Sequence, residues 1–510
     1  MAFVRGGKMM NYLEQELEEQ KKMSYTENGA LGYGTTKSAL LDLNFQVGSL
    51  RGAPEEEIQL LFEAAFYENK AYALKWLFYA RDVREGLGER RLFRICYKRL
   101  GGLDFSLFRR NLGIIAIYGR WDDLVSLYGI SENADAFITA TIKSQLERDL
   151  ISLSTGGAVS LLAKWLPSEN ASSIDTKNLA KKVRRSLKMT SKEYRQTLSK
   201  LRKRIGVVER QMCSNEWDKI DYERVPSMAN LKYKEAFLRN DYNRRLNYLG
   251  SVASGSKKMN MNVATPVDIV SRYMRDGYSV REIDHTLELA WRNLKNISIH
   301  DTLVVADGSG SMTVRVGGGS TRALDVANAL AIYSSEHNQG VYRNKYITFS
   351  SRPQLVSFEE DQLLAEKIKT CLRHDECSNT NIQAVFELIL NTAIANKLSQ
   401  DEMVKNVLII SDMEFDRAQT TWGGDAPLTM PLFKVIQAKY EAAGYKLPRL
   451  IFWNVNSRTK IIPLIENELG VTLVSGFSQN VLKMVMSEKY DPYEVLIETI
   501  TAPRYDKVRA

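Results

Sequence analysis

The sequence of 510 residues predicts a multidomain protein, with an all-α N-terminal part followed by a doubly wound α/β C-terminal part. From about residue 36 to 295, apolar residues return at spacings of three and four, as they do in amphipathic helices. After Ser298, continuous runs of β-forming residues alternate with amphipathic segments, which is typical of a buried parallel sheet. We expect a peripheral arm over residues 1–23, a helical domain over 24–297 and an α/β domain over 298–510.

The helical part shows clear start signals. Pro54 precedes three glutamates, and proline and carboxylates both suit the first turn of a helix. Further helices are expected over about 70–83, 89–100, 104–118, 120–128, 133–151, 157–165, 176–188, 191–204, 230–240, 266–275 and 279–294. So many short helices with short connections favour stacked antiparallel pairs, as in an α-solenoid, although no repeat of fixed period is present. The stretch from Tyr248 to Val263 lacks periodicity and predicts an exposed loop.

The α/β part is expected to contain five buried strands with helices between them. The strands are predicted over residues 302–306, 345–349, 407–410, 449–453 and 470–474, and the clearest helices over 322–336, 381–393 and 432–443. In open sheets of this kind, ligands bind at the carboxyl ends of the strands.

Asp307-Gly-Ser309-Gly-Ser311 stands at the carboxyl end of the first of these strands. Its carboxylate and hydroxyl oxygens suit Mg²⁺, Mn²⁺ or Ca²⁺ rather than zinc. Read alone, this string also fits a plain Gly and Ser loop without a metal. Thr380 at the start of a helix and Asp412 after a buried strand add two oxygen donors, so the sequence predicts a divalent-cation site with five ligand residues.

Basic residues are concentrated in one stretch of the helical part. The whole chain has a net charge of +9, yet 13 basic residues face only 3 acidic ones between Ser172 and Arg210. Such a stretch predicts a polyanionic partner, and the alternative is a surface tolerated in physiological salt. Lys181, Arg184, Arg185 and Lys188 are expected to share one helical face. The candidate RNA-binding residues are Lys164, Lys181, Lys182, Arg184, Arg185, Lys188, Arg202, Lys203 and Arg204.

Other functional classes lack support in the sequence. It contains no Gly-x-x-x-x-Gly-Lys string, no Gly-x-Ser-x-Gly elbow and no His-Glu-x-x-His, so we expect no enzymatic activity. The four cysteines and four histidines have no zinc-type spacing, which favours reduced thiols in a cytoplasmic protein. No apolar run reaches the roughly 18 to 20 residues that span a bilayer, so a membrane partner is not expected.

The five predicted ligand residues resemble the metal-ion-dependent adhesion site of von Willebrand factor A domains, which have a Rossmann-like α/β fold. In this resemblance Asp307, Ser309 and Ser311 form the first motif, Thr380 the second and Asp412 the third. It implies a bound Mg²⁺ or Mn²⁺ with one coordination position left for an acidic residue of a protein partner. Where the family often has Asp-Gly in the third motif, this chain continues with two further carboxylates, Glu414 and Asp416, whose role the sequence does not assign.

The order of a helical part and such a domain resembles the Ro autoantigen, or TROVE, architecture, as a divergent relative. The strings that carry the resemblance lie at residues 80–93, 118–124, 162–168 and 225–229. It implies HEAT-like helical repeats arranged as a ring that binds small structured noncoding RNAs outside and single-stranded RNA ends in its hole. Trp121 and Trp165 in these strings are also explained as core residues.

Two functions remain open from the sequence. The first is an RNA-binding scaffold whose metal-bearing domain docks a protein partner. The second is a protein-binding adaptor or structural component that uses the metal site for adhesion and binds no nucleic acid. Salt sensitivity of binding distinguishes them, because phosphate contacts release counterions.

Overall fold

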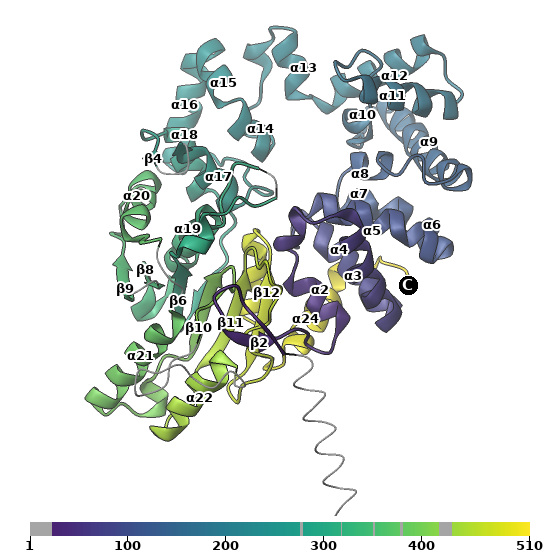
Figure 1. The fold of residues 1–510 in the computed structure, drawn as a ribbon. Coiled ribbons are helices and arrows are strands. Elements are labelled where there is room, and N and C mark those ends of the chain that lie inside the picture. The colour runs from purple at the N-terminus through teal and green to yellow at the C-terminus, as the bar shows by residue number, and fades with distance from the viewer. Residues whose placement is uncertain (1–22, 276–278, 318, 350–351, 378–380, 418–430) are drawn as a thin grey trace, which may run out of the picture. The chain divides into compact units, whose positions relative to one another are not determined.

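A computed structural model of the chain describes residues 23–275, 279–317, 319–349, 352–377, 381–417 and 431–510 (Figure 1). The chain forms two compact units, each assembled from three separate stretches. One unit comprises Met1–Asn69, Thr265–Ile283 and Asn296–Ile500, and the other comprises Lys70–Ala264, Asp284–Lys295 and Thr501–Ala510. This division differs from the single boundary at residue 298 that the sequence suggested, because both chain ends pack away from their neighbours in sequence.

A six-stranded sheet forms the centre of the first unit within the described residues. Its strands are β6 (Thr302–Asp307), β8 (Lys345–Phe349), β9 (Gln354–Ser357), β10 (Asn406–Ser411), β11 (Arg449–Asn454) and β12 (Val471–Ser475). They lie in the order β12-β11-β10-β6-β8-β9, and every neighbouring pair is parallel except β8 and β9. The five predicted strands are therefore confirmed. The edge strand β9 was not predicted, since only one of its four residues is buried.

The predicted helices of this unit are confirmed as α19 (Ala323–Glu336), α21 (Ile382–Asn396) and α22 (Leu432–Ala442). Every residue of α19 but its last is buried, and it covers one face of the sheet. Helices α21 and α22 lie together on the other face (Figure 1), where the Tyr440 hydroxyl donates a hydrogen bond of 2.9 Å to the Phe386 carbonyl. Helix α20 (Leu364–His374) was not predicted.

The N-terminal stretch belongs to the α/β unit. It contains the hairpin of β1 (Met23–Tyr25) and β2 (Leu31–Tyr33), followed by α2 (Ala39–Phe45) and α3 (Glu55–Glu68). Tyr33 and Ile462 exchange two backbone hydrogen bonds of 2.8 and 2.9 Å. The backbone N–H of Gly48 donates to the Ser475 hydroxyl at 2.8 Å, where a Cβ atom would lie only 2.7 Å from the Val455 carbonyl oxygen. Close backbone packing thus attaches this stretch to the sheet.

Two shorter segments complete the α/β unit. The first is α17 (Pro266–Tyr273) with the small hairpin of β3 (Met274–Arg275) and β4 (Ser279–Val280), and α17 packs on α19. The second is a two-residue parallel pair of β5 (Ile299–His300) and β7 (Asn338–Gln339). The ends of the helices predicted over 266–275 and 279–294 are wrong here, since residues 274–275 and 279–280 form strands and the second helix begins only at His285. The pair of β5 and β7 was not predicted, because strands this short carry no periodic pattern.

In the other unit, helices are the only regular secondary structure among the described residues, as the sequence predicted. Its helices are α4 (Lys70–Arg81), α5 (Arg90–Leu103), α6 (Phe105–Asn111), α7 (Ile115–Tyr118), α8 (Trp121–Val125), α9 (Glu132–Ser154), α10 (Leu162–Trp165), α11 (Ile174–Ser186), α12 (Ser191–Ile205), α13 (Val208–Cys213), α14 (Ser227–Lys232), α15 (Lys234–Asn240), α16 (Tyr242–Ala253) and α18 (His285–Arg292). The predicted loop from Tyr248 is wrong in its first part, since α16 continues to Ala253 and buries Tyr248 and Val252 at helical spacing.

A network of ion pairs connects two of the sequence strings quoted above, at residues 80–93 and 118–124, and gives their charged residues a structural role. The Arg81 guanidinium and the Asp123 carboxylate are 2% and 0% exposed and lie 2.7 Å apart. Arg94 donates to the other Asp123 oxygen at 2.8 Å, and Asp122 accepts from both Arg94 and Arg120. Buried charges need such partners, so these residues stabilise the contact between α4, α5 and α8.

The last ten residues pack on the helical unit. The buried Asp82 carboxylate accepts two hydrogen bonds from the Arg504 guanidinium, the one to Nη2 measuring 2.7 Å. The Tyr505 hydroxyl also donates to Asp82, at 3.2 Å. Farther along, the Asn111 amide group pairs with the backbone of Arg509 through two hydrogen bonds of 2.8 and 2.9 Å.

Other properties of the described residues are simple. No helix among them is both long and apolar enough to cross a bilayer. Cys96, Cys213, Cys371 and Cys377 are free thiols, of which Cys96 and Cys371 are buried.

Arg504→Ala should lower the free energy of unfolding by about 2 to 4 kcal/mol, because Asp82 would keep a buried charge without its cation. The measurement is the urea midpoint with the slope unchanged. Arg239→Ala, at an exposed position on α15, is the control and should change it little. A loss equal to that of the control would contradict the anchoring role of the C-terminal residues.

Candidate metal centre and basic surface

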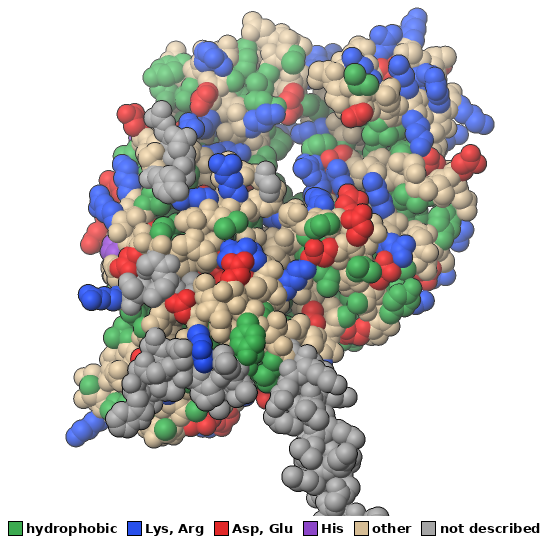
Figure 2. Space-filling view, in the orientation of Figure 1, with side chains coloured by type: hydrophobic (Ala, Val, Ile, Leu, Met, Phe, Trp, Pro, Cys, Tyr) green, Lys and Arg blue, Asp and Glu red, His purple; other side chains and the backbone are tan. Residues whose placement is uncertain are grey.

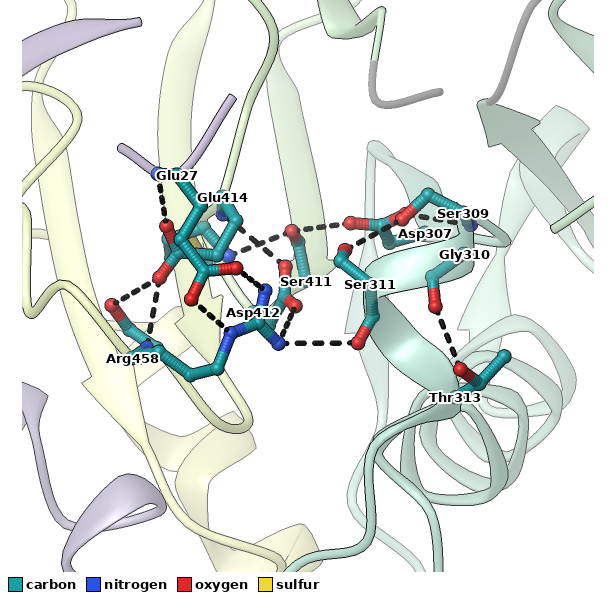
Figure 3. Close-up of polar contacts among 12 residues, drawn as sticks. Glu27, Asp307, Ser309, Gly310, Ser311, Thr313, Ser411, Asp412, Glu414 and Arg458 are labelled. Carbon is teal, nitrogen blue, oxygen red and sulfur yellow. Dashed lines mark hydrogen bonds and ion pairs between the residues drawn. The ribbon is translucent and has the colours of Figure 1, made fainter. Parts of the chain in front are cut away.

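The predicted cation site forms where β6 and β10 lie side by side. These strands pair in parallel with Ala306 opposite Ile410, so their carboxyl ends meet at one edge of the sheet. Asp307 ends β6 and is 1% exposed. Ser411 ends β10 and donates a hydrogen bond of 2.6 Å to Asp307 Oδ2, which places Asp412 directly beside the end of β6 (Figure 3).

The loop after β6 brings its serines to the same place. The Ser309 backbone N–H donates to Asp307 Oδ1 at 2.9 Å, and the Ser309 and Ser311 hydroxyl oxygens lie 3.0 Å apart. The Ser311 side chain also lies close enough to the Asp412 carboxylate to lower the pKa of that group. The structure therefore brings together four of the five predicted ligand residues, and the fifth, Thr380, lies outside the described residues.

The two carboxylates of this site share a low-dielectric environment. Burial, and then the neighbouring Asp412 charge, raise the pKa of Asp307 to about 7. Burial raises the pKa of Asp412 to about 6, although the Arg458 guanidinium opposes the change. Two adjacent buried acids are stabilised in their charged form by a cation between them.

The donor set fits a hard divalent cation. It offers two carboxylates and two hydroxyls, while the described residues contain no group of three or more His, Cys, Asp or Glu side chains placed to hold a metal ion. Magnesium commonly keeps waters in such an incomplete protein shell. The residues Asp307, Ser309, Ser311 and Asp412 are therefore compatible with Mg²⁺, Mn²⁺ or Ca²⁺.

Glu414 has a different role from the four candidate ligand residues. Its buried carboxylate accepts hydrogen bonds from the backbone N–H groups of Glu27 at 3.0 Å, Arg458 at 2.8 Å and Thr459 at 2.9 Å. The Thr459 hydroxyl adds two more contacts of 2.9 and 3.0 Å. This carboxylate thus joins the loop after β11, the N-terminal hairpin and the turn after β10, where Met413 adopts a left-handed conformation with φ 64°.

Asp375 lies next to Gly308, which is in the loop that follows β6. Its Oδ2 accepts a hydrogen bond of 2.8 Å from the Asn328 amide, and burial raises its pKa to about 7. The Cys377 backbone N–H donates to the Gly308 carbonyl at 2.9 Å. A Cβ atom on Gly308 would lie 3.3 Å from Asp375 Oδ1, so glycine permits this close approach.

The nine predicted RNA-binding residues lie in the helical unit, and all but Lys164 fall into two groups. The first group has exposed side chains and consists of Lys181, Lys182, Arg185, Lys188, Lys203 and Arg204. Figure 2 shows Lys and Arg side chains gathered over the surface that α11 and α12 form. Lys182 pairs with Asp135 at 2.7 Å, and Arg204 donates to the carbonyl of Gly157 at 3.0 Å. Among the described residues, none forms a side-chain hydrogen bond or ion pair with Lys181, Arg185, Lys188 or Lys203.

The second group serves internal contacts. Arg184 donates to Glu169 and to the Met189 carbonyl, both at 2.8 Å, so it does not share the exposed helical face with Lys181 and Arg185 as predicted. Lys188 is not on this face either, because α11 ends at Ser186 and Lys188 adopts a left-handed conformation with φ 55°. Arg202 donates to the carbonyls of residues 163 and 166 and to the Ser168 hydroxyl, each at 2.8 Å. These acceptors come from other segments, and the sequence pattern alone does not reveal them.

Lys164 lies beside one of the tryptophans. Its ammonium group is 5.6 Å from the centre of the Trp165 ring, and the Arg120 guanidinium lies over the same ring at 4.1 Å. Trp165 and Trp121 are both partly buried, so they contribute to packing while keeping some exposed surface.

Four residues around the candidate site were missed by sequence reasoning: Glu27, Ser411, Asp375 and Arg458. Ser411 directly precedes a predicted ligand at the end of a strand, which is a usable signal. Glu27 and Arg458 are 431 positions apart and carry no local signal. Their contribution follows from tertiary packing alone.

Comparisons with known proteins agree with a two-part chain. A family model described as "Domain of unknown function (DUF7788)" matches residues 301–502, and another described as "Domain of unknown function (DUF2828)" matches residues 26–101 and 171–300. The chain is 30% identical over 525 residues to "Uncharacterized protein L728" of Acanthamoeba polyphaga mimivirus, with 94% of this chain and 87% of the relative covered. The chain belongs to the L728 family. None of these descriptions names an activity, so the site geometry carries the functional argument.

The raised pKa of Asp307 predicts a pH-dependent stability. A carboxyl group whose folded-state pKa is about 7, against 3.8 ordinarily, binds a proton more tightly when folded. Its unfavourable contribution is absent below about pH 4, grows between about pH 4 and 7 by at most about 1.4 kcal/mol per pH unit, and stays constant above pH 7. In EDTA, Asp307→Asn should therefore become more stable relative to wild type from pH 5 to pH 8.

Urea unfolding at unit steps of pH measures this difference. Asp361→Asn, at an exposed position of the same unit, is the control. A difference between Asp307→Asn and wild type that stays constant across this range would contradict the shared burial of Asp307 and Asp412.

Proposed function

We propose that this protein is an RNA-binding scaffold of TROVE-like architecture, in which the helical unit binds RNA phosphates and a von Willebrand factor A-type domain docks an acidic protein partner through a divalent cation. The observation that carries the proposal is the convergence of Asp307, Ser309, Ser311 and Asp412 at one edge of the sheet. These residues are adjacent only because β6 and β10 pair, so the motif and the topology support one another.

The metal half of the proposal follows from the donor set. Asp307 and Asp412 would supply charge, Ser309 and Ser311 would supply hydroxyl oxygens, and Thr380 remains a predicted donor. A bound Mg²⁺, or Mn²⁺ or Ca²⁺, would attract an acidic oxygen of the partner. The buried carboxylates of Asp307 and Asp412 would supply the negative charge that binds such a cation.

The RNA half rests on exposed, unneutralised charge. Lys181 and Arg185 lie one turn apart on α11, and Lys188 follows just after this helix. Like charges at this spacing repel one another unless an anion lies between them. The phosphate groups of RNA provide anions at regular spacing, and we propose that stacked α-helical repeats present these cations to them.

A scaffold fits the site better than a hydrolase. The hydroxyls of Ser309 and Ser311 contact each other and acidic neighbours. His337 and His374 use their Nδ1 atoms within their own helices, on the carbonyls of Tyr333 and Thr370. A serine nucleophile activated by histidine needs the imidazole within hydrogen-bond reach, and neither His337 nor His374 hydrogen-bonds Ser309 or Ser311.

The second candidate function is a protein-binding adaptor without nucleic acid. The engagement of Lys182, Arg184, Arg202 and Arg204 in internal contacts favours it, because less basic charge is left for RNA than the sequence suggests. In this case an acidic protein would bind the surface of α11 and α12. The salt dependence of RNA binding separates the two functions.

Replacing Lys181 and Arg185 together by glutamate should weaken binding of a single-stranded RNA about tenfold or more at physiological salt. The slope of log affinity against log salt should fall by roughly 1.4, since each lost phosphate contact contributes about 0.7. Mobility-shift titrations across a salt series provide both quantities. Lys98→Glu with Arg239→Glu, also exposed in the helical unit, is the control. Equal weakening by both double variants would exclude a specific RNA surface at α11.

Asp307→Ala should abolish tight Mn²⁺ binding and leave RNA affinity within about twofold of wild type, because phosphate contacts carry the affinity for RNA. Electron paramagnetic resonance of free Mn²⁺ measures the first quantity and a mobility shift the second. Asp361→Ala, at an exposed position, should retain both. A parallel loss of metal and RNA binding would contradict separate sites.

A further inference from the structure

Arg458 connects the candidate metal centre to the N-terminal hairpin. Its Nη1 atom lies 3.2 Å from Asp412 Oδ2 and 3.2 Å from the Ser311 carbonyl oxygen. The opposite side of the guanidinium, Nε and Nη2, donates to the two Glu27 oxygens at 2.8 and 2.6 Å. Figure 3 shows Arg458 lying between Glu27 and Asp412.

The two sides of this guanidinium differ in exposure. The Asp412 side chain is 0% exposed, whereas the Glu27 side chain is 49% exposed. Exposed ion pairs contribute only about 0 to 1 kcal/mol, since water and salt replace the partner readily. The contact of Arg458 with Asp412 is closed to solvent. The contact with Glu27 is open to solvent, so another carboxylate can take the place of Glu27.

The backbone around Glu27 is held without help from its side chain. The Glu27 N–H donates to Glu414 Oε2 at 3.0 Å, and the Asn28 side chain donates to the Glu414 carbonyl at 2.6 Å. The Thr26 hydroxyl donates to the Phe415 carbonyl at 2.7 Å. A change of the Glu27 carboxylate thus leaves the hairpin docked, and its effect on the site can be measured separately.

We propose that Arg458 is a second recognition residue for the acidic ligand of the metal site, and that Glu27 occupies the ligand's position on Arg458 in the free protein. This inference rests on the proposed function. A planar guanidinium presents parallel donors that match the two oxygens of one carboxylate, a geometry that Lys does not offer. The site therefore selects a carboxylate ligand able to contact both the cation and Arg458, and that ligand displaces the Glu27 side chain.

A competing account is that Arg458 only neutralises buried acid. Glu414 does not need it for this purpose, because its carboxylate already accepts three backbone N–H groups and a hydroxyl. Neutralising Asp412 requires one edge of the guanidinium, and the bidentate contact of the other edge with Glu27 stays unexplained. The recognition role accounts for both edges.

The test uses the full chain loaded with Mn²⁺ and glutarate as the carboxylate probe. Water-proton relaxation reports Mn²⁺ binding and falls when glutarate replaces water on the ion. Glu27→Gln should lower the half-saturating glutarate concentration about fivefold, because the internal competitor is lost. Arg458→Gln should raise it about fivefold, and the double variant should match Arg458→Gln alone, since the two residues act through one contact.

Glutaramide, which is neutral, should leave the signal unchanged and serves as the control. Glutarate binding that is insensitive to Glu27→Gln, or strictly additive effects in the double variant, would overturn the role of Arg458. A wild-type protein that fails to bind Mn²⁺ would instead overturn the proposed metal site, and the recognition role with it. Mn²⁺ binding that survives in both single variants, together with the expected changes in glutarate binding, supports the inference.

Discussion

The parallel pairing of β6 with β10 is the constraint on which the candidate site depends. It brings the ends of two strands that are about a hundred residues apart in the sequence to one edge of the sheet. The hydrogen bond from Ser411 to Asp307 then fixes the side chains there, at 2.6 Å. Two carboxylates become buried next to each other, an arrangement that is unfavourable for ionised groups without a cation. The strand pairing thus determines where these carboxylates lie, and it places them where a bound cation would stabilise their charged forms.

Glu414 organises the second layer of this region. A buried carboxylate is stable only when hydrogen-bonded, and Glu414 accepts from backbone N–H groups of the first hairpin and of the loop after β11 and from the Thr459 hydroxyl of the same loop. The same loop carries Arg458, and the same hairpin carries Glu27. One buried acid therefore aligns residues from the beginning and the end of the chain beside Asp412.

The sequence predicted what local patterns encode. The five parallel strands are continuous apolar runs, and the ligand residues stand at the ends of β6 and β10, so both were accessible without a structure. Long-range packing was not accessible. The attachment of β1 and β2 to the α/β unit depends on Tyr33 and Ile462, and the attachment of the last residues to the helical unit depends on Asp82 and Arg504. In the same way, Arg202 appears in the sequence as one more basic residue, while the structure shows it holding three acceptors of another segment.

The two candidate sites use charge in opposite ways. At the sheet edge, acidic side chains are buried beside one another, whereas on α11 and α12 basic side chains are exposed. Anomalous diffraction from crystals soaked in Mn²⁺ tests most directly whether the candidate site at the sheet edge binds a cation. The account predicts one strong peak at roughly 2 to 2.5 Å from the hydroxyls of Ser309 and Ser311, next to Asp412. No peak at this edge of the sheet, at Mn²⁺ concentrations that saturate ordinary sites, would contradict it.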